Sequence, residues 1–324
     1  MSRLAQLLLV FLGLALACAN PAPPPAAAPE PFSGERAFAQ LERLVALGPR
    51  VAGTPAAASA HTLVRDELTV LGLEVHEDAF SWRPTPEAEE VTLVNLWADV
   101  PGPEAGLYAV ATPLDTAPGR DAPIPGANEG GSGAALLLEL ARSLQERPLA
   151  YTVRLLFLDG ELRDEKNAFL GSKRAYFQLR DAGAFEQLRL LLYVHQVGDR
   201  ELEVRRDSLS DRKLRDFFFI AAQRTGHAGA FPANAPYEEI ELGHGVFARN
   251  RFPHVVALAD LRFGGPDVPG SHWRTPADDL ANCSAKSLGA VGAVVRAGLE
   301  VVTERQRAID RAGGAAAHRK EGAP

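Results

Sequence analysis

The sequence predicts an α/β fold, an α/β/α sandwich built around a central mixed, mostly parallel β-sheet. The first observation is that strand-like stretches alternate along the chain with stretches whose apolar residues recur at helical spacing. The second is that YTVRLLFLDG (151–160) and QLRLLLYVHQVG (187–198) are nearly continuous apolar runs, as in strands covered on both faces. Alternating strands and helices with buried strands are typical of a sheet flanked by helices.

The elements follow one another in a regular order. Helices are expected at residues 35–47, 56–72, 132–145, 168–179, 210–226 and 284–304. Strands are expected at residues 73–80, 91–100, 106–112, 151–160, 187–198 and 253–260. Ligand sites of such folds lie at the carboxyl ends of strands, which singles out the stretches ATPLDT, LDGEL and HQVGD.

The N-terminus has the pattern of an export signal over residues 1–17. Arg3 precedes an apolar run that is too short to span a bilayer. Cys18 follows small residues, as in a bacterial lipoprotein signal, so we expect lipidation at Cys18 and a cell-envelope location. The alternatives are cleavage after Ala15-Leu16-Ala17, which gives a secreted or periplasmic protein, and an unprocessed anchor.

The rest of the chain divides into three parts. Residues 18–31 are rich in Pro and Ala and predict an extended linker. Residues 32–306 predict one domain, which a chain of 324 residues allows. Residues 307–324 lose the apolar periodicity and predict a flexible tail.

Composition argues against nucleic-acid binding and against a cysteine-based metal site. The net charge is −7 and no basic run occurs, so nucleic-acid binding has no electrostatic support. Membrane contact is expected only through the N-terminal lipid. The two cysteines are Cys18 and Cys283. If Cys18 is lipidated or removed, Cys283 has no partner, so neither an intramolecular disulfide nor a cysteine zinc cluster is expected. Cys283 is interpreted as a small buried or capping residue before a helix.

Five segments together resemble the M28 zinc peptidase family, and within it the bacterial glutaminyl-peptide cyclotransferase-like branch. The segments are ATPLDT, PGANEGGSG, LDGEL, HQVGD and HWRTPADDL. The resemblance covers nearly the whole mature chain and implies a zinc aminopeptidase or a cyclase that closes N-terminal Gln into pyroglutamate. Such chemistry needs His and carboxylate ligands around Zn²⁺ with one open position, and a Glu that moves a proton.

Carried over position by position, the resemblance implies that most metal ligands are substituted. Pro113 stands at the place of a ligating His, Leu162 at that of a Glu, and Arg274 at that of a second His. A proline, a leucine and a permanently protonated guanidinium cannot bind a metal. The sequence therefore predicts a metal-free protein, with zinc expected only under the alternative below.

The remaining positions keep some donor chemistry. Glu129 and His195 each replace a family Asp and are the fallback metal ligands, while Glu161 retains the general-base position. A relocated metal site would add Asp115 and His272. The simpler interpretation makes Asp115 and Glu129 hydrogen-bond or capping residues, His195 a satisfied polar residue, and His272 an exposed or stacked ring.

The pocket of the family has further counterparts in this chain. The resemblance places Asp115, His244, His272 and Trp273 around it, with Trp273 either lining the pocket or packing in the core. Gly243 precedes His244 where cyclase-like members carry an Asp that supports the proton network. The loss of that Asp adds to the loss of ligands.

Two functions follow. The leading hypothesis is a catalytically degenerate M28 homologue, a pseudoenzyme that retains a pocket for peptide or protein N-termini. The alternative is an active zinc aminopeptidase or glutaminyl cyclase with rearranged ligands and Glu161 as base. We further expect Arg274 to pair with Glu129 or Glu161 in place of the metal. A paired Glu161 would have a lowered pKa and would be a poor general base.

Overall fold

The central sheet has six strands in the order β1-β2-β4-β3-β5-β6. A computed structural model describes residues 32–83, 85–163 and 168–321, so the export signal, the linker and Cys18 lie outside it. The strands are β1 (Val75–Trp82), β2 (Val91–Val100), β3 (Glu104–Pro113), β4 (Tyr151–Leu158), β5 (Leu188–His195) and β6 (Val255–Ala259). Only β2 runs against its neighbours, and β4, β3, β5 and β6 are parallel. The predicted mixed, mostly parallel sheet is confirmed.

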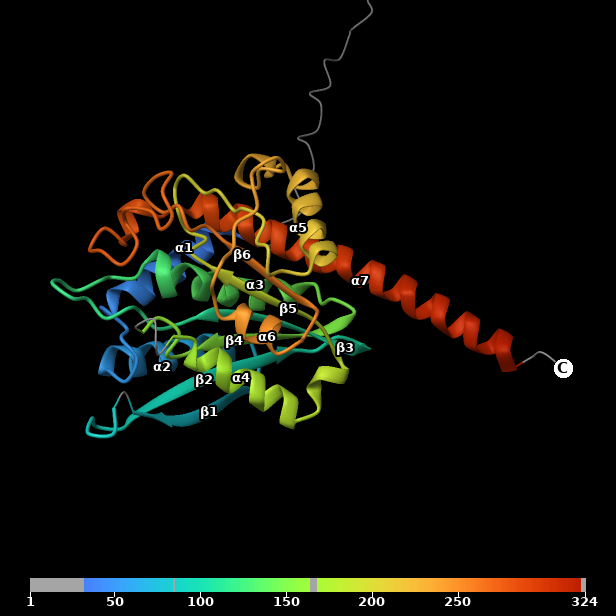
Figure 1. Cartoon of the computed structure of the whole chain (residues 1–324), viewed down its shortest axis with the longest axis horizontal. Helices are drawn as coiled ribbons and strands as arrows, with labels where there is room; N and C mark the ends of the chain where they lie inside the picture. Colours follow the sequence, from blue (N-terminus) through green and yellow to red (C-terminus); the bar gives the residue numbers. More distant parts are fainter. Residues whose placement is uncertain (1–31, 84, 164–167, 322–324) are drawn as a thin grey trace, which may run out of the picture. The chain divides into compact units, whose positions relative to one another are not determined.

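Helices cover both faces of the sheet (Figure 1). One face is covered by α1 (Gly34–Ala46), α2 (Pro55–Val70), α3 (Gly133–Glu146), α5 (Arg212–Arg224) and α7 (Ala285–Glu321). The other face is covered by α4 (Leu170–Asp181) and α6 (His244–Arg249). Short turns are η1 (Asn128–Ser132), η2 (Ala184–Glu186), η3 (Ala228–Ala230) and η4 (Leu280–Asn282). The predicted α/β/α arrangement is therefore confirmed.

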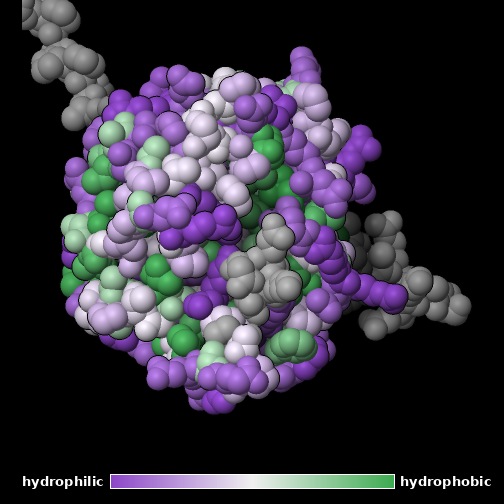
Figure 2. All heavy atoms as spheres, turned by 60° about the vertical axis from the view of Figure 1, so that its left-hand side comes forward, coloured by the Kyte–Doolittle hydropathy of each residue, from purple (hydrophilic) through white to green (hydrophobic). Residues whose placement is uncertain are grey.

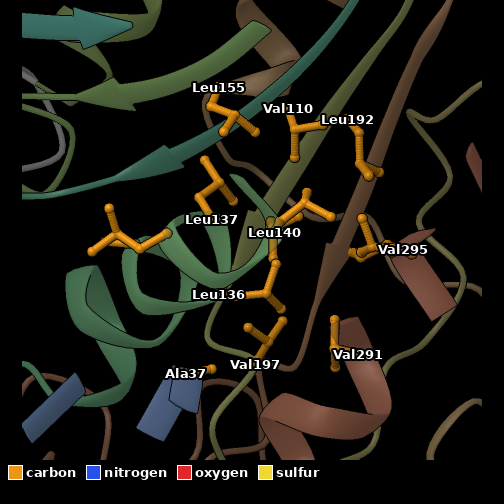
Figure 3. Close-up of a cluster of buried hydrophobic side chains, with 14 of the residues drawn as sticks. Ala37, Val110, Leu136, Leu137, Leu140, Leu155, Leu192, Val197, Val291 and Val295 are labelled. Atoms are coloured by element: carbon orange, nitrogen blue, oxygen red, sulfur yellow. The ribbon is translucent and has the colours of Figure 1, made fainter. Parts of the chain in front are cut away.

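The alternation of side chains along each strand builds a separate core on each face. Val110 of β3 packs in the core beneath α3, while its neighbour Ala109 packs in the core beneath α4. Figure 3 shows Leu137 and Leu140 of α3 beside Val110 and other strand residues. Each fully buried leucine contributes about 1.5–3 kcal/mol of stability. These two cores hold the strand ends in fixed positions.

Local sequence sets several helix starts. Thr54 caps α2 directly before Pro55, and Asp211 accepts a hydrogen bond from the backbone N–H of Leu214 at 2.9 Å in α5. Side-chain oxygens at this position satisfy N–H groups that have no partner inside the helix. The helix predicted at residues 210–226 therefore begins after Asp211, which caps it.

Three features differ from the sequence expectations. The helix expected to end at residue 304 continues to Glu321, and Arg307 forms an ion pair with Glu104. The alanines among residues 308–317 favour that continuation, and Gly313 and Gly314 oppose it. The helix α6 was not predicted because six residues give too short a pattern. In addition, β2 and β3 are joined by a short connection but are separated in the sheet by β4.

Two smaller expectations can be compared with the structure. Cys283 is buried and unpaired immediately before α7, as predicted. Among the described helices, none is both long enough and apolar enough to cross a membrane.

Candidate functional site

The candidate site lies at the carboxyl ends of β3, β4 and β5. Pro113 is the last residue of β3, His195 is the last residue of β5, and Glu161 follows β4. The loops 114–127 and 262–280 lie at the same edge, at the left of Figure 1. This side comes forward in Figure 2, where mostly hydrophilic side chains cover it. The structure thus brings together segments that are distant in sequence.

Glu161 is a fully buried carboxylate whose two oxygens are occupied by donors. Its Oε1 accepts the backbone N–H of Ser172 at 2.6 Å, and its Oε2 accepts Ser172 Oγ at 2.8 Å and Tyr193 Oη at 2.6 Å. Burial raises the pKa of Glu161, and the three donors oppose that rise because they favour the ionised form. No arginine in the described part of the chain pairs with Glu161, so the lowered pKa considered for such a pair is not found.

Gly243 lies against this carboxylate. A Cβ at Gly243 would stand 2.1 Å from Ser172 Oγ, 2.5 Å from Glu161 Oε2 and 2.6 Å from the Tyr193 ring. These contacts are too close for any side chain. The position that the resemblance gives to a supporting Asp is therefore filled by the hydroxyl groups of Ser172 and Tyr193.

Asp115 holds the turn that carries Glu161. Its Oδ1 accepts the backbone N–H of Glu161, and its Oδ2 accepts that of Leu162, both at 3.0 Å. Burial, followed by the nearby Asp159, raises the pKa of Asp115 well above its ordinary value. The interpretation of Asp115 as a hydrogen-bonding residue is confirmed. Asp115 therefore orients the backbone N–H groups of this turn.

A second cluster is formed by Glu129, Trp273 and Arg274. Glu129 is 2 % exposed, and its Oε1 accepts Trp273 Nε1–H at 3.0 Å. Its Oε2 lies 3.5 Å from Arg274 Nε, which is an ion-pair distance but long for a hydrogen bond. The guanidinium lies 4.6 Å from the centre of the Trp273 ring. Of the two carboxylates considered for Arg274, the structure places Glu129 beside it.

Burial has the largest effect on Glu129 and raises its pKa, although Arg274 and the Trp273 donor both favour the charged form. Arg274 itself has φ +54°, a left-handed conformation that costs a non-glycine residue free energy. The pair is therefore held in place by its surroundings and is not a relaxed surface contact.

The loop that carries Glu129 is fixed from behind by Asp278. The two carboxylate oxygens of Asp278 accept the backbone N–H groups of Asn128 at 2.6 Å and Glu129 at 3.1 Å. Gly130 follows with φ +85°, and a Cβ there would meet Asp115 O at 1.9 Å. Burial raises the pKa of Asp278 to about 7. Buried hydrogen bonds and a close backbone contact therefore fix the conformation of the segment PGANEGGSG.

His195 and His272 differ in how well they are satisfied. His195 is 2 % exposed, and its Nδ1 has no hydrogen-bond partner among the described residues. Burial and then Arg274 lower the pKa of His195 to about 3, so the ring is neutral. The interpretation of His195 as a satisfied polar residue is wrong, because the end of β5 buries its ring beside a positive charge. His272 is only partly exposed, and its ring meets Phe263 edge-on with the ring centres 5.1 Å apart, so it is neither fully exposed nor stacked face to face.

His244 belongs to a separate buried pair. Its Nε2 lies 2.9 Å from Asp207 Oδ2, and both side chains are fully buried. Asp207 also accepts Ser210 Oγ at 2.8 Å, and this pairing lowers the pKa of Asp207 despite its burial. His244 is therefore paired with Asp207, and its ring centre lies 6.3 Å from that of Tyr193, which donates a hydrogen bond to Glu161.

The residues present do not fit a zinc ion. Of the five ligand positions implied by the resemblance, only those of Glu129 and His195 carry side-chain atoms that can bind a metal. The two oxygens of Glu129 face Trp273 and Arg274, and a fixed positive charge beside them disfavours a cation. Within the ranges that the structure describes, no three His, Cys, Asp or Glu side chains are grouped closely enough to hold a metal. Catalytic zinc sites use three such protein ligands.

Comparison with known proteins identifies the family. The model of peptidase family M28 matches residues 95–299, which is more than half of the chain. The chain belongs to peptidase family M28.

Solved structures similar to this M28 chain include glutaminyl cyclases and an exopeptidase. A glutaminyl cyclase from an Acidobacteriales bacterium is 26 % identical with a TM-score of 0.78, over 88 % of this chain and 100 % of that one. A glutaminyl cyclase from Porphyromonas gingivalis is 22 % identical with a TM-score of 0.75, over 84 % and 99 %. A Zn-dependent exopeptidase from Parabacteroides distasonis is 20 % identical with a TM-score of 0.76, over 85 % and 99 %. The search of curated proteins finds no match.

These findings confirm the predicted resemblance to the M28 family and its glutaminyl cyclase-like branch. Sequence reasoning missed three side chains that shape the site of this M28 chain, namely Ser172, Tyr193 and Asp278. A signal existed for Tyr193, which lies two residues before His195 in a strand and so faces the same side. Asp278 follows Arg274 closely, but its backbone partners lie about 150 residues away in the chain.

Proposed function

We propose that this chain is a metal-free, non-catalytic member of the M28 family that binds peptide or protein ends, with N-termini as the end suggested by the family. The observation that carries the proposal is the pairing of Arg274 with Glu129. A guanidinium stands at a position implied for a metal ligand, and it neutralises the carboxylate that could have bound the cation. The charge of the metal is thus replaced by a side chain.

The state of Glu161 supports the same proposal. A general base must reach the proton that it removes, directly or through one water molecule. Glu161 is fully buried and its oxygens are occupied by Ser172 and Tyr193. In this arrangement Glu161 stabilises the packing between β4, β5 and α4 and does not meet a substrate.

The proposed location is the cell envelope, with the domain exported and anchored through a lipid on Cys18. The support is the sequence pattern of residues 1–18. A Cys18→Ser variant that partitions into the membrane fraction as fully as the parent would contradict the lipid anchor.

The test of the metal-free state is the zinc content of the purified chain after incubation with zinc and desalting. We expect well below one zinc per chain. About one zinc per chain that is lost in Glu129→Ala or His195→Ala would overturn the proposal and favour an active enzyme with rearranged ligands. Peptidase and cyclase assays with and without a chelator would then follow.

A double variant provides the converse test. Arg274→His together with Leu162→Glu would restore metal-binding atoms at two of the implied ligand positions and, with Glu129, give a three-ligand set. We expect this variant to bind zinc more tightly than the parent. If its zinc content equals that of the parent, Arg274 and Leu162 are not what excludes the metal.

A further inference from the structure

We infer that Arg274 is a receptor for a carboxylate group, so that the ligand of this site is an acidic group of a peptide rather than its N-terminal amine. This inference rests on the metal-free binding site proposed above, and it replaces the N-terminus suggested by the family with a carboxylate as the group that is bound. It depends on how the guanidinium is held, which of its donors remain free, and what surrounds it.

The guanidinium of Arg274 is held on two sides. Its Nε faces Glu129 Oε2 at 3.5 Å, and its plane lies over the Trp273 ring at 4.6 Å. Glu129 is itself fixed by Trp273 Nε1–H and by the backbone bonds from its loop to Asp278. A cation held in this way loses little freedom when it binds a ligand, which increases affinity.

The two terminal nitrogens of Arg274 remain free. Within residues 32–83, 85–163 and 168–321 they donate to no side chain or carbonyl, and they are not buried, whereas Nε is. The side chain as a whole is 27 % exposed. Two parallel N–H groups in one plane match the two oxygens of a carboxylate, and this geometry is why arginine binds carboxylates in a bidentate manner.

The charge at the site favours the same ligand. A protonated amine would approach the fixed charge of Arg274, and the carboxylate nearest to it, Glu129, lies behind Nε and is 2 % exposed. Glu161, the carboxylate at the general-base position, is fully buried and is hydrogen-bonded to Ser172 and Tyr193. Neither carboxylate is therefore available to an incoming amine.

In the described part of the chain, buried polar atoms without partners occur at Glu129 and His195, which lie near Arg274, and at residues close to these in the sequence. Buried polar groups almost always have hydrogen-bond partners, and exceptions call for an explanation. Within the described residues, Glu129 Oε2, His195 Nδ1, His272 Nδ1 and both amide atoms of Gln196 are buried without one. Gln196 and Arg274 also have positive φ angles of 51° and 54°. Strained backbone and unpaired polar groups occurring together are typical of ligand sites.

The carboxylate could come from the C-terminus of a peptide or from an acidic side chain, and small probes distinguish the two. N-acetylalanine carries only an α-carboxylate, N-acetylglutamic acid α-amide carries only a side-chain carboxylate, and alaninamide carries only an amine. N-acetylalaninamide carries neither charge and serves as the blank. Each would be titrated into the ¹⁵N-labelled chain while the indole N–H signals are followed by NMR.

The chain has three tryptophans, so a Trp273→Phe variant assigns the signal of Trp273. We expect at least one carboxylate probe to shift the Trp273 signal saturably, with a Kd on the order of 10 mM for so small a ligand. Which of the two binds more tightly identifies the source. Alaninamide and N-acetylalaninamide should leave the signal in place.

Variants of Arg274 then test the receptor itself. Arg274→Ala should weaken carboxylate binding by roughly 10- to 100-fold, the effect of losing a charged hydrogen-bonding partner. Arg274→Lys keeps the charge without the planar pair of donors and should bind more weakly than the parent. Arg212→Ala removes an exposed arginine at the start of α5 and should change nothing.

Three results would overturn the inference. They are a shift with alaninamide alone, equal shifts with N-acetylalanine and N-acetylalaninamide, and no shift with any probe. The first leaves the proposed binding of N-termini intact. Failure of the proposed function looks different, since stoichiometric zinc would make carboxylate binding sensitive to a chelator and insensitive to Arg274→Ala.

Discussion

The site has two halves, one around Glu161 and one around Glu129, and they differ in how completely the buried carboxylate is paired. At Glu161 both carboxylate oxygens accept hydrogen bonds, the side chain is fully buried, and Gly243 leaves no free volume. Around Glu129 the pairing with Arg274 is long, the guanidinium reaches solvent, and polar atoms of neighbouring residues lack partners. Both halves lie at the carboxyl ends of the same parallel strands.

The difference separates a structural half from a binding half. Saturated polar networks in a dry interior add rigidity, whereas incompletely satisfied ones remain available to a ligand. A site that had only lost its chemistry would have relaxed on both sides. The retained strain and free donors at Arg274 instead favour continued use of that half.

The largest expected effect is at Gly243, in the structural half. We expect Gly243→Ala to lower the free energy of unfolding by about 2–3 kcal/mol, because the new Cβ would overlap Ser172, Glu161 and Tyr193. Urea unfolding followed by circular dichroism measures it. Gly229→Ala, where the added methyl group meets open space, should change stability by no more than about 0.5 kcal/mol. Equal stability of the two variants would show that the Glu161 half is not tightly packed.

The fold could be predicted from sequence because each strand and helix has its own recognisable spacing of apolar and polar residues. The apolar runs that became β4 and β5 were recognisable as buried strands without reference to other segments. The residue types at the site were readable in the same way, since Pro113, Leu162 and Arg274 exclude metal binding by their chemistry alone.

The environment of each site residue was harder to predict. Whether Arg274 meets Glu129 or Glu161 depends on how loops far apart in sequence approach each other at the sheet edge. The hydroxyl of Tyr193 was hidden in an apolar run, and nothing local indicates that it meets Glu161. The lack of a partner at His195 Nδ1 is likewise a property of the assembled core.

A smaller effect is expected from His195, in the binding half, and it depends on pH. The pKa of His195 is lowered to about 3 from an ordinary 6.5. Below pH 6.5 the unfolded chain takes up a proton at His195 and the folded chain does not. The parent should therefore lose stability relative to His195→Gln as the pH falls from 6.5 toward 3, by up to about 1.4 kcal/mol per pH unit.

Urea unfolding of both proteins at several pH values between 7 and 4 provides the measurement, and the titration of all shared carboxylates cancels in the difference. Parallel curves would mean that His195 is protonated in the folded chain. It would then pair with a carboxylate. The polar groups around Glu129 would be paired as completely as those around Glu161, and the difference between the two halves would disappear.

The smallest effect on stability is expected at Arg274 itself. In Arg274→Gly, loss of a partly exposed ion pair costs about 0–1 kcal/mol and loss of the contact with Trp273 about 0.5–1 kcal/mol. Relief of the left-handed backbone returns about 1 kcal/mol, so the free energy of unfolding should stay within about 1 kcal/mol of the parent. Binding of the carboxylate probe that the parent binds more tightly should nevertheless be lost.

Arg251→Gly is the matched control, because Arg251 is an exposed arginine with φ +63° outside the site. It should gain slightly in stability and bind the probe as the parent does. If Arg274→Gly instead unfolds as readily as Gly243→Ala, Arg274 supports the core and the division into two halves fails. If it stays folded and loses the probe, the stability of the domain resides around Glu161 and the recognition resides at Arg274.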